Sequence, residues 1–367
     1  MRSTMRGLVW VVCIALLAAA CGGGGDGQSE QAAAEEEATT AEAGGASTEG
    51  GDATAEAEPE VSDVTVTQAV ASLAFLPVYV ARAQGFYEER GLNVEQIVTQ
   101  GGGPDLQALL AGDAEFNAGA GTYQINALRE GQDVQNVYNY MNRSIINIVM
   151  SQQAADEAGV TEDSPLEEKL AALEGKTIGV TRPGSLTDAT ARFLVRQAGL
   201  DPDADTNIIG VGGGGAIVAA LQQGQVDAIA ISSPISEQAA QGDAIMLINN
   251  TKGVVQSIDP FMMENIYVRP DFAEQNPNTV AAFVEATREG TQWAIDHSAE
   301  EIADAIASDF ADLDREVLVS SLENVKGALN EGGELTMEAV DNTLTMLGED
   351  DIETERVFNL FTDDFVQ

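Results

Sequence analysis

The chain has 367 residues, and its 60 acidic side chains against 17 Lys and Arg give a formal net charge of −43. A negative field of this size repels nucleic acid and anionic lipid surfaces, so neither is expected as a partner. The single histidine, His297, falls in a predicted tail helix far from the Gly-rich turns, so a histidine-based catalytic triad is not expected.

The first 21 residues have the pattern of a secretory signal. Arg2 and Arg6 precede an apolar stretch at residues 8–20, which is too short for a confident membrane span. Cys21 follows three alanines and resembles the lipobox of secreted lipoproteins, although Ala18 stands where that pattern usually has Leu. We therefore predict a lipoprotein signal peptide over residues 1–21, with lipid attachment at Cys21. Ordinary cleavage with an incidental Cys21 is the alternative.

Residues 22–60 have a low-complexity composition. They contain eleven acidic residues and no Lys or Arg, with Gly, Ala, Thr and Ser making up most of the rest. Such a segment cannot build a core, and its like charges repel one another. We predict a disordered acidic linker that tethers the folded part to the lipid anchor.

A block of the folded part occurs twice, 112 residues apart. The Gly-rich turn at residues 101–103 corresponds to 213–215, and Gly112 corresponds to Gly224. Each copy alternates apolar strand patterns with helical ones, which is typical of α/β folds. Two similar α/β halves favour two lobes with a cleft between them, and ligands of open α/β sheets bind at the carboxyl ends of the strands.

The predicted elements follow in chain order. Strands are predicted at residues 64–70, 94–99, 115–118, 134–140, 177–180, 208–211 and 228–231. Helices are predicted at residues 76–83, 104–110, 122–129, 165–173, 185–198 and 216–223, followed by a helical tail from residue 278 onward. A turn is predicted at residues 85–92. The apolar runs at 145–151 and 245–248 are predicted to cross between the lobes, so lobe I comprises residues 61–148 and 246–367, and lobe II comprises 149–245.

Several stretches resemble the substrate-binding proteins of ABC importers, in the nitrate, sulfonate and taurine branch. They are residues 78–92 (VYVARAQGFYEERGL), 101–121 (GGGPDLQALLAGDAEFNAGAG), 173–200, 220–227 (ALQQGQVD) and 272–294. The resemblance covers nearly all of residues 62–300. It implies a type II, two-lobe periplasmic-binding-protein fold of the α/β class, which closes on a ligand in the cleft by hinge motion. It also implies permease and ATPase subunits as partners.

Wider relatives of that branch bind precursors of the thiamine pyrimidine. The cysteine-rich motif of the thiamine-precursor synthases is absent from this sequence. An enzyme on the same fold, such as a pyrimidine-precursor synthase, remains the alternative function. An importer component for a neutral heterocycle remains the alternative for the ligand.

The candidate ligand-binding residues lie in turns at the predicted strand ends or beside the hinge. They are Ser72, Phe75, Gly102, Gly103, Gly121, Thr122, Tyr138, Arg143, Arg182, Gly184, Ser185, Gly213, Ser232 and Ser233. Backbone N–H groups and helix N-termini can bind an anion without a side-chain cation. The folded part carries a formal charge near −34, so an anionic ligand needs a locally positive cleft. Arg182 is the best-placed cation for that purpose.

The sequence therefore predicts a lipid-anchored, monomeric solute-binding protein on the outer face of the cytoplasmic membrane. We expect a small, anionic ligand such as a sulfonate, nitrate, taurine-like compound or organic acid. No catalytic residue, cofactor or metal site is expected. Asp201, Asp203 and Asp205 alternate like the start of a calcium loop, but Thr206 stands where such a loop needs Gly.

Overall fold

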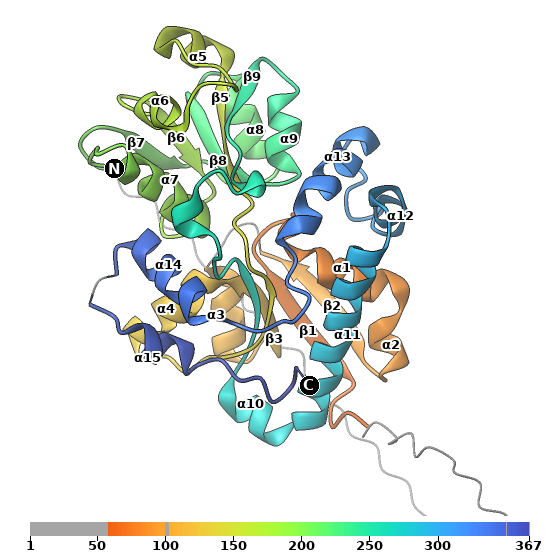
Figure 1. The fold of residues 1–367 in the computed structure, drawn as a ribbon. Helices are drawn as coiled ribbons and strands as arrows, with labels where there is room; N and C mark the ends of the chain where they lie inside the picture. The colour runs from red at the N-terminus through yellow and green to blue at the C-terminus, as the bar shows by residue number, and fades with distance from the viewer. Residues whose placement is uncertain (1–57, 100–102, 350, 367) are drawn as a thin grey trace, which may run out of the picture. The chain divides into compact units, whose positions relative to one another are not determined.

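The computed structural model describes residues 58–99, 103–349 and 351–366. Cys21, Gly102 and the predicted linker before residue 58 lie outside the described residues. Within the compact unit Ala55–Gln367, the strands form two five-stranded mixed sheets, which we call sheet A and sheet B (Figure 1). We call the part built on sheet A lobe I and the part built on sheet B lobe II.

Sheet A has the strand order β2-β1-β3-β10-β4. Its strands are β1 (Asp63–Gln68), β2 (Asn93–Val98), β3 (Phe116–Ala120), β4 (Gln135–Met141) and β10 (Glu264–Val268). Strands β2 and β3 run parallel to β1, whereas β10 runs antiparallel to both β3 and β4. The helices that follow the first three strands are α1 (Leu76–Gln84), α2 (Phe86–Glu89), α3 (Pro104–Ala111) and α4 (Gly121–Glu130).

Sheet B repeats this arrangement with the order β7-β6-β8-β5-β9. Its strands are β5 (Ile146–Ser151), β6 (Thr177–Val180), β7 (Asn207–Gly210), β8 (Ala228–Ser232) and β9 (Ala244–Ile248). Here β5 is the antiparallel strand between β8 and β9. The helices are α5 (Gln152–Ala158), α6 (Leu166–Ala171), α7 (Leu186–Gln197), α8 (Gly215–Gln222) and α9 (Ile235–Ala240).

The 112-residue repeat is confirmed in the strand register. Val66 pairs with Phe116 in sheet A, and the residues 112 positions later, Ile178 and Ala228, pair in sheet B. The side-chain contacts repeat as well: the Thr65 N–H donates to Glu115 Oε2 (2.8 Å), and the Thr177 N–H donates to Asp227 Oδ2 (2.7 Å). The two lobes are therefore built from the same unit.

The crossings between the sheets lie beside the predicted ones. Residues 142–145 lead from β4 to β5, and residues 249–263 lead from β9 to β10. The apolar runs predicted as crossings are themselves strands of sheet B, and residues 146–148 and 246–248, which the prediction placed in lobe I, belong to lobe II. The reason is that a buried crossing segment and a buried strand have the same continuous apolar pattern.

The helical tail contacts both lobes. Helix α10 (Pro270–Gln275) leads into α11 (Pro277–Asp296), which packs along α1 of lobe I, and α12 (Ala299–Ala305) contacts the following α13 (Arg315–Val325). Helix α13 contacts α9 of lobe II. Helix α14 (Met337–Leu347) contacts α4 of lobe I and α7 of lobe II, and α15 (Thr354–Phe358) contacts α4. Within the described residues, no helix is long and apolar enough to cross a membrane.

A glycine allows the close approach of α11 to α1. A Cβ atom on Gly290 would lie 2.5 Å from the Pro77 carbonyl oxygen and 2.9 Å from the Ala81 nitrogen. Both neighbours are backbone atoms of α1, so the helices would have to move apart to admit a methyl group. The tail is thereby attached to lobe I through a contact that admits only glycine without such a shift.

We expect Gly290→Ala to lower the free energy of unfolding by about 1–3 kcal/mol, the range for an overpacked interior. Gly215→Ala is the matched control, because a Cβ there meets nothing within 4 Å. That control should be neutral or stabilising by about 0.4–1 kcal/mol, because alanine restricts the unfolded chain more than glycine does. Urea denaturation of both variants decides the point. Equal stability of the two would contradict the packing described here.

Candidate functional site

A cavity of about 50 Å³ lies between the lobes. Its walls come from lobe I and its returning segment (Ala69, Val70, Ala74, Phe75, Gly119, Ala120, Tyr123, Met263, Glu264) and from lobe II (Ile146, Thr181, Ser185, Leu186, Thr187, Ile231, Ser232). Most of them follow the carboxyl ends of the parallel strands, which is where open α/β sheets bind ligands.

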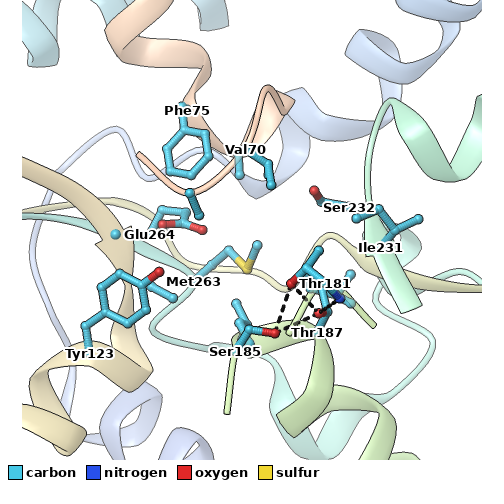
Figure 2. A pocket seen from close by; sticks show the side chains of 16 residues that line it. Val70, Phe75, Tyr123, Thr181, Ser185, Thr187, Ile231, Ser232, Met263 and Glu264 are labelled. Atoms are coloured by element: carbon cyan, nitrogen blue, oxygen red, sulfur yellow. Dashed lines mark hydrogen bonds between the residues drawn. The ribbon is translucent and has the colours of Figure 1, made fainter. Parts of the chain in front are cut away.

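The lobe I wall combines apolar and acidic groups. Figure 2 shows Phe75 and the carboxyl group of Glu264 on the same side of the pocket as Tyr123, with Met263 between them and the hydroxyl groups of lobe II. The Tyr123 hydroxyl donates to the carboxylate of Asp105, at 3.0 and 3.1 Å from its two oxygens. Tyr123 therefore links the pocket to a second, deeper acid.

The lobe II wall carries a cluster of three hydroxyl groups. The Thr181 hydroxyl lies 3.0 Å from that of Ser185 and 2.9 Å from that of Thr187, and the Ser185 and Thr187 hydroxyls are 2.9 Å apart (Figure 2). Ser185 also caps the N-terminus of α7. The three hydroxyls satisfy one another and present a polar but uncharged surface to the pocket.

One turn in each lobe, at Gly103 and at Gly184, is closed by an aspartate. The Gly103 N–H donates to Asp105 Oδ1, and the Gly184 N–H donates to Asp188 Oδ2, both at 2.8 Å. Asp105 lies in the first turn of α3 and Asp188 in the first turn of α7, where a carboxylate is favoured by the helix dipole. Two of the N–H groups expected to bind an anionic ligand, those of Gly103 and Gly184, are thus already bonded to carboxylates of the chain.

Two buried carboxyl groups stand near the pocket without a basic partner. Neither Asp105 nor Glu264 takes part in an ion pair among the described residues, and Glu264 Oε2 has no hydrogen-bond partner there. Burial, and then the charge of Asp105, raises the pKa of Glu264 well above its usual range. Burial also raises the pKa of Asp105, against the hydrogen bonds from Tyr123 and the Gly103 N–H. The pocket therefore has an acidic, poorly solvated wall.

The lobes touch directly at the mouth of this region. The Ser72 hydroxyl lies 2.7 Å from that of Ser232 and 3.0 Å from the Ser233 carbonyl oxygen, which also accepts the Leu73 N–H at 3.0 Å. A Cβ atom on Gly213 of lobe II would lie 2.9 Å from a Val70 methyl group of lobe I. Small residues at these positions allow the lobes to meet over the pocket.

The sequence profile of the family described as NMT1/THI5 like matches residues 72–301, which include most of both lobes. The chain belongs to the NMT1/THI5-like family.

Named proteins with similar sequences or structures are consistent with this family. The chain is 24% identical over 277 residues to YtlA of Bacillus subtilis (strain 168), which carries the name of a binding protein, and the match covers 75% of this chain and 78% of that one. The fold of the present chain is that of periplasmic binding proteins. It superposes with a TM-score of 0.65 on the alkanesulfonate-binding protein SsuA of Xanthomonas axonopodis pv. citri bound to MOPS, at 16% identity over 83% of this chain and 99% of that one. For the nitrate-binding protein NrtA of Synechocystis PCC 6803, the TM-score is 0.66 at 18% identity, over 84% and 88% of the two chains.

Three of the residues predicted for the ligand site in this NMT1/THI5-like chain line the pocket: Phe75, Ser185 and Ser232. Tyr123 lines it too. Ser72, Ser233 and Gly213 lie beside the pocket and form the contact between the lobes.

The other predicted residues serve the scaffold in this structure. Tyr138 is buried in lobe I and donates to Thr291 Oγ1 at 3.1 Å, because β4 packs against α11. Gly121 donates its N–H to the Met262 carbonyl oxygen at 3.1 Å, and a Cβ there would lie 2.3 Å from that oxygen. Thr122 is buried in the first turn of α4. Gly103 and Gly184 form the aspartate-closed turns.

The two candidate arginines lie outside the pocket wall. Arg143 belongs to the first crossing, and its Nε donates to Asp259 Oδ2 in the second crossing at 3.0 Å. Its Nη1 donates to the Gly327 carbonyl oxygen in the tail at 3.2 Å. Arg182 is half-buried between β6 and α7, and its carbonyl oxygen accepts the Ser185 N–H at 3.3 Å and hydroxyl at 2.8 Å.

The acidic residue of the pocket, Glu264, was not predicted from the sequence. Glu264 is the first residue of β10, a strand that was not predicted between the second crossing and the tail. The available signal was an acid inside the otherwise apolar run FMMENIYV at residues 261–268, because Glu is rarely buried in a strand without a partner. Met263, Val70 and Thr187 are ordinary apolar or small polar residues that carry no such signal.

We expect Arg143→Ala to loosen the hinge without changing the pocket lining. Removing a half-exposed ion pair that joins both crossings should lower the free energy of unfolding by up to about 1 kcal/mol. Hydrogen exchange should quicken at residues 142–145 and 249–263, because these segments lose their shared contact. Arg315→Ala, which removes the exposed Arg315–Asp304 pair of the tail, is the control and should leave exchange in both crossings unchanged. Unaltered exchange in Arg143→Ala would refute this role.

Proposed function

We propose that the chain is the lipid-anchored solute-binding component of an ABC importer. It holds a small ligand in the pocket between its lobes and delivers it to a permease driven by ATPase subunits. The observation that carries the proposal is the pocket itself: both lobes line it at the carboxyl ends of their strands, in a chain of a family whose named relatives include binding proteins. Opening of the lobes about residues 142–145 and 249–263 would admit and release the ligand.

We infer that Cys21 carries the lipid anchor and that the folded part acts as a monomer on the outer face of the membrane; the lipobox-like position of Cys21 and the acidic segment after it support this location. Such a linker would let the folded part reach the permease while it stays near the bilayer. An anchored donor also keeps a high local concentration at the transporter, since a tether turns the encounter into an intramolecular step.

An enzyme on the same fold is the competing function. On the lobe II wall, the Thr181, Ser185 and Thr187 hydroxyls are bonded to one another, and the Ser232 hydroxyl is bonded to that of Ser72. Within the described residues none of them is bonded to a base, which a nucleophilic hydroxyl needs. His297 lies in the tail, stacked on Trp293 with ring centroids 3.9 Å apart. These contacts favour binding over catalysis.

Two ligand classes follow from the sequence, an anion and a neutral heterocycle. The charged side chain that lines the pocket is Glu264, and the lining contains no Lys or Arg within the described residues. An anion would have to leave water for a site next to a buried acid, with no cation to offset that cost. The lining therefore favours a ligand without negative charge over the anion that the sequence analysis expected.

Membrane attachment should depend on Cys21. Replacing its thiol in Cys21→Ser removes the acylation site, and the folded part should appear in the soluble extracytoplasmic or medium fraction with its thermal stability unchanged. Cell fractionation with immunoblotting measures this, and Cys13→Ser is the matched control that should stay membrane-bound. A membrane-bound Cys21→Ser protein would disprove the anchor.

Ligand binding should depend on the space in the pocket. A tryptophan at Ala69, a half-buried lining residue, would occupy the cavity, so Ala69→Trp should not bind. A thermal-shift screen of sulfonates, nitrate, aromatic carboxylates and nitrogen heterocycles should find compounds that stabilise the native chain, by about 2.7 kcal/mol at a hundredfold excess over Kd. Ala111→Trp, at an exposed position on α3, is the control and should bind normally. Stabilisation that survives in Ala69→Trp would place the ligand elsewhere.

A further inference from the structure

The acid in the pocket is not required by the fold. Glu264 pairs with Ala120 across β10 and β3. In lobe II the residue 112 positions after Ala120 is Ser232, which pairs with Ile146 across β8 and β5. The same structural position therefore holds an acid in one lobe and an apolar side chain in the other, and both side chains line the pocket. A position that accepts isoleucine has no structural need for a carboxyl group.

The surroundings of Glu264 leave it uncompensated. Its residue is 5% exposed, and its Oε2 has no hydrogen-bond partner. None of the described hydrogen bonds or ion pairs reaches its carboxyl group, whereas Asp105 is held by Tyr123 and by a backbone N–H. Burying an unpaired carboxyl group is unfavourable unless a proton or a bound group compensates it. Since this side chain faces a cavity, the missing partner can come from a ligand.

We propose that Glu264 selects the ligand of this pocket by accepting hydrogen bonds from a cationic nitrogen group, an amidinium or ammonium, attached to an apolar body. The inference rests on the proposed function, because it takes the pocket between the lobes as the ligand site. A carboxylate is an acceptor, and its bonds to charged N–H donors are stronger than those to neutral ones. The ligand's cation would supply the charge that the protein itself does not place there.

The remaining walls define the rest of the ligand. Phe75, Val70, Met263, Ile146 and Leu186 give the pocket a mainly apolar lining, which suits an aromatic or branched aliphatic body. The hydroxyls of Ser185, Thr181 and Thr187 on the lobe II wall can exchange hydrogen bonds with an uncharged polar substituent (Figure 2).

Titration of Glu264 is coupled to the groups around it. Its charge interacts with Asp105 on α3, Tyr123 on α4, Tyr140 on β4 and Tyr267 on its own strand. The tyrosines have pKa values raised by burial and stay neutral near pH 7. Because the pKa of Glu264 is raised, its carboxyl group in the empty pocket stays protonated to a higher pH than that of an exposed glutamate. A permanently cationic ligand requires the ionised form, so its binding releases a proton and tightens as the pH rises.

The test uses probes that share one apolar body and differ in the head group: benzamidine, benzylamine, benzamide and benzenesulfonate. Isothermal calorimetry on the full folded chain should show benzamidine or benzylamine binding at least tenfold more tightly than benzamide and benzenesulfonate. Affinity of the cationic probe should rise between pH 5 and pH 8, with proton release detected in buffers of different ionisation enthalpy.

The variants locate the effect. In Glu264→Gln the affinity for the cationic probe should fall about ten- to a hundredfold, as expected for loss of a charge-assisted hydrogen bond, while benzamide affinity changes little. Glu95→Gln is the matched control, because it removes the same charge from an exposed position of β2 in the same sheet, and it should bind the cationic probe as the native chain does. Thermal unfolding of each variant verifies that it is folded. The pH and proton-release measurements use the native chain, so they test the role of an ionised acid even if a variant fails to fold.

The outcomes separate this inference from the proposed function. Benzenesulfonate binding that is lost in Ala69→Trp but retained in Glu264→Gln would overturn the role of Glu264 and leave the solute-binding function intact. Absence of binding by both cationic probes would also overturn it. Loss of every thermal-shift response in the native chain would instead count against the proposed function. If the affinity for the cationic probes changes neither in Glu264→Gln nor with pH, another group recognises them and the inference is refuted.

Discussion

Each sheet of this protein is completed by a strand that arrives from the other lobe. In sheet A, β10 lies between β3 and β4 after the chain has built all of sheet B, and in sheet B, β5 lies between β8 and β9 directly after the first crossing. Neither sheet is continuous without this strand, since β3 and β4 would each be left with unpaired backbone groups. The two crossings follow from this requirement, and so does a hinge made of two separate segments.

The direction of the returning strands determines which residues reach the pocket. Parallel strands end at the edge of the sheet that faces the other lobe, and an antiparallel strand begins at that same edge. The first residues of β10 and β5, Glu264 and Ile146, therefore line the same cavity as the last residues of β3 and β8. The fold thus provides two equivalent positions facing the pocket, and the sequence has made them chemically different. Under the proposed function, that difference would determine which ligand binds, whereas the shared backbone would provide only the space.

Much of the fold could be predicted because its signals are local. The repeat of Gly-rich turns and apolar strands predicted β1 to β4 and β6 to β8. Its 112-residue spacing is also found in the strand register, where Val66 pairs with Phe116 and Ile178 pairs with Ala228. The returning strands were not assigned correctly because their partners lie far away in sequence. An apolar run such as residues 146–151 has the same pattern whether it crosses between sheets or completes one.

The candidate site was predicted less well for a related reason. The turn glycines and Ser185 were found from their place after a strand, but the partner of each turn was not visible in the sequence. Asp105 and Asp188 lie within four residues of the glycines whose N–H groups donate to them. Each carboxylate therefore occupies the acceptor position that a bound anion was expected to take. Tyr138 shows the opposite case, because a tyrosine in a strand has the same pattern when it faces a cleft and when it faces a helix such as α11.

At the mouth of the pocket the two lobes meet through few contacts of their own. Ser72 and Leu73 are hydrogen-bonded to Ser232 and Ser233 across the cleft, and Gly213 approaches Val70. Each neutral hydrogen bond contributes only about 0.5–1.5 kcal/mol net, and closing over an empty pocket leaves Glu264 buried without a partner. A ligand that compensates this carboxyl group removes an unfavourable term from the closed state alone, because the open lobes leave the group to water. Differential binding of this kind is what shifts a two-state equilibrium, so the same acid that selects the ligand would also make closure depend on it.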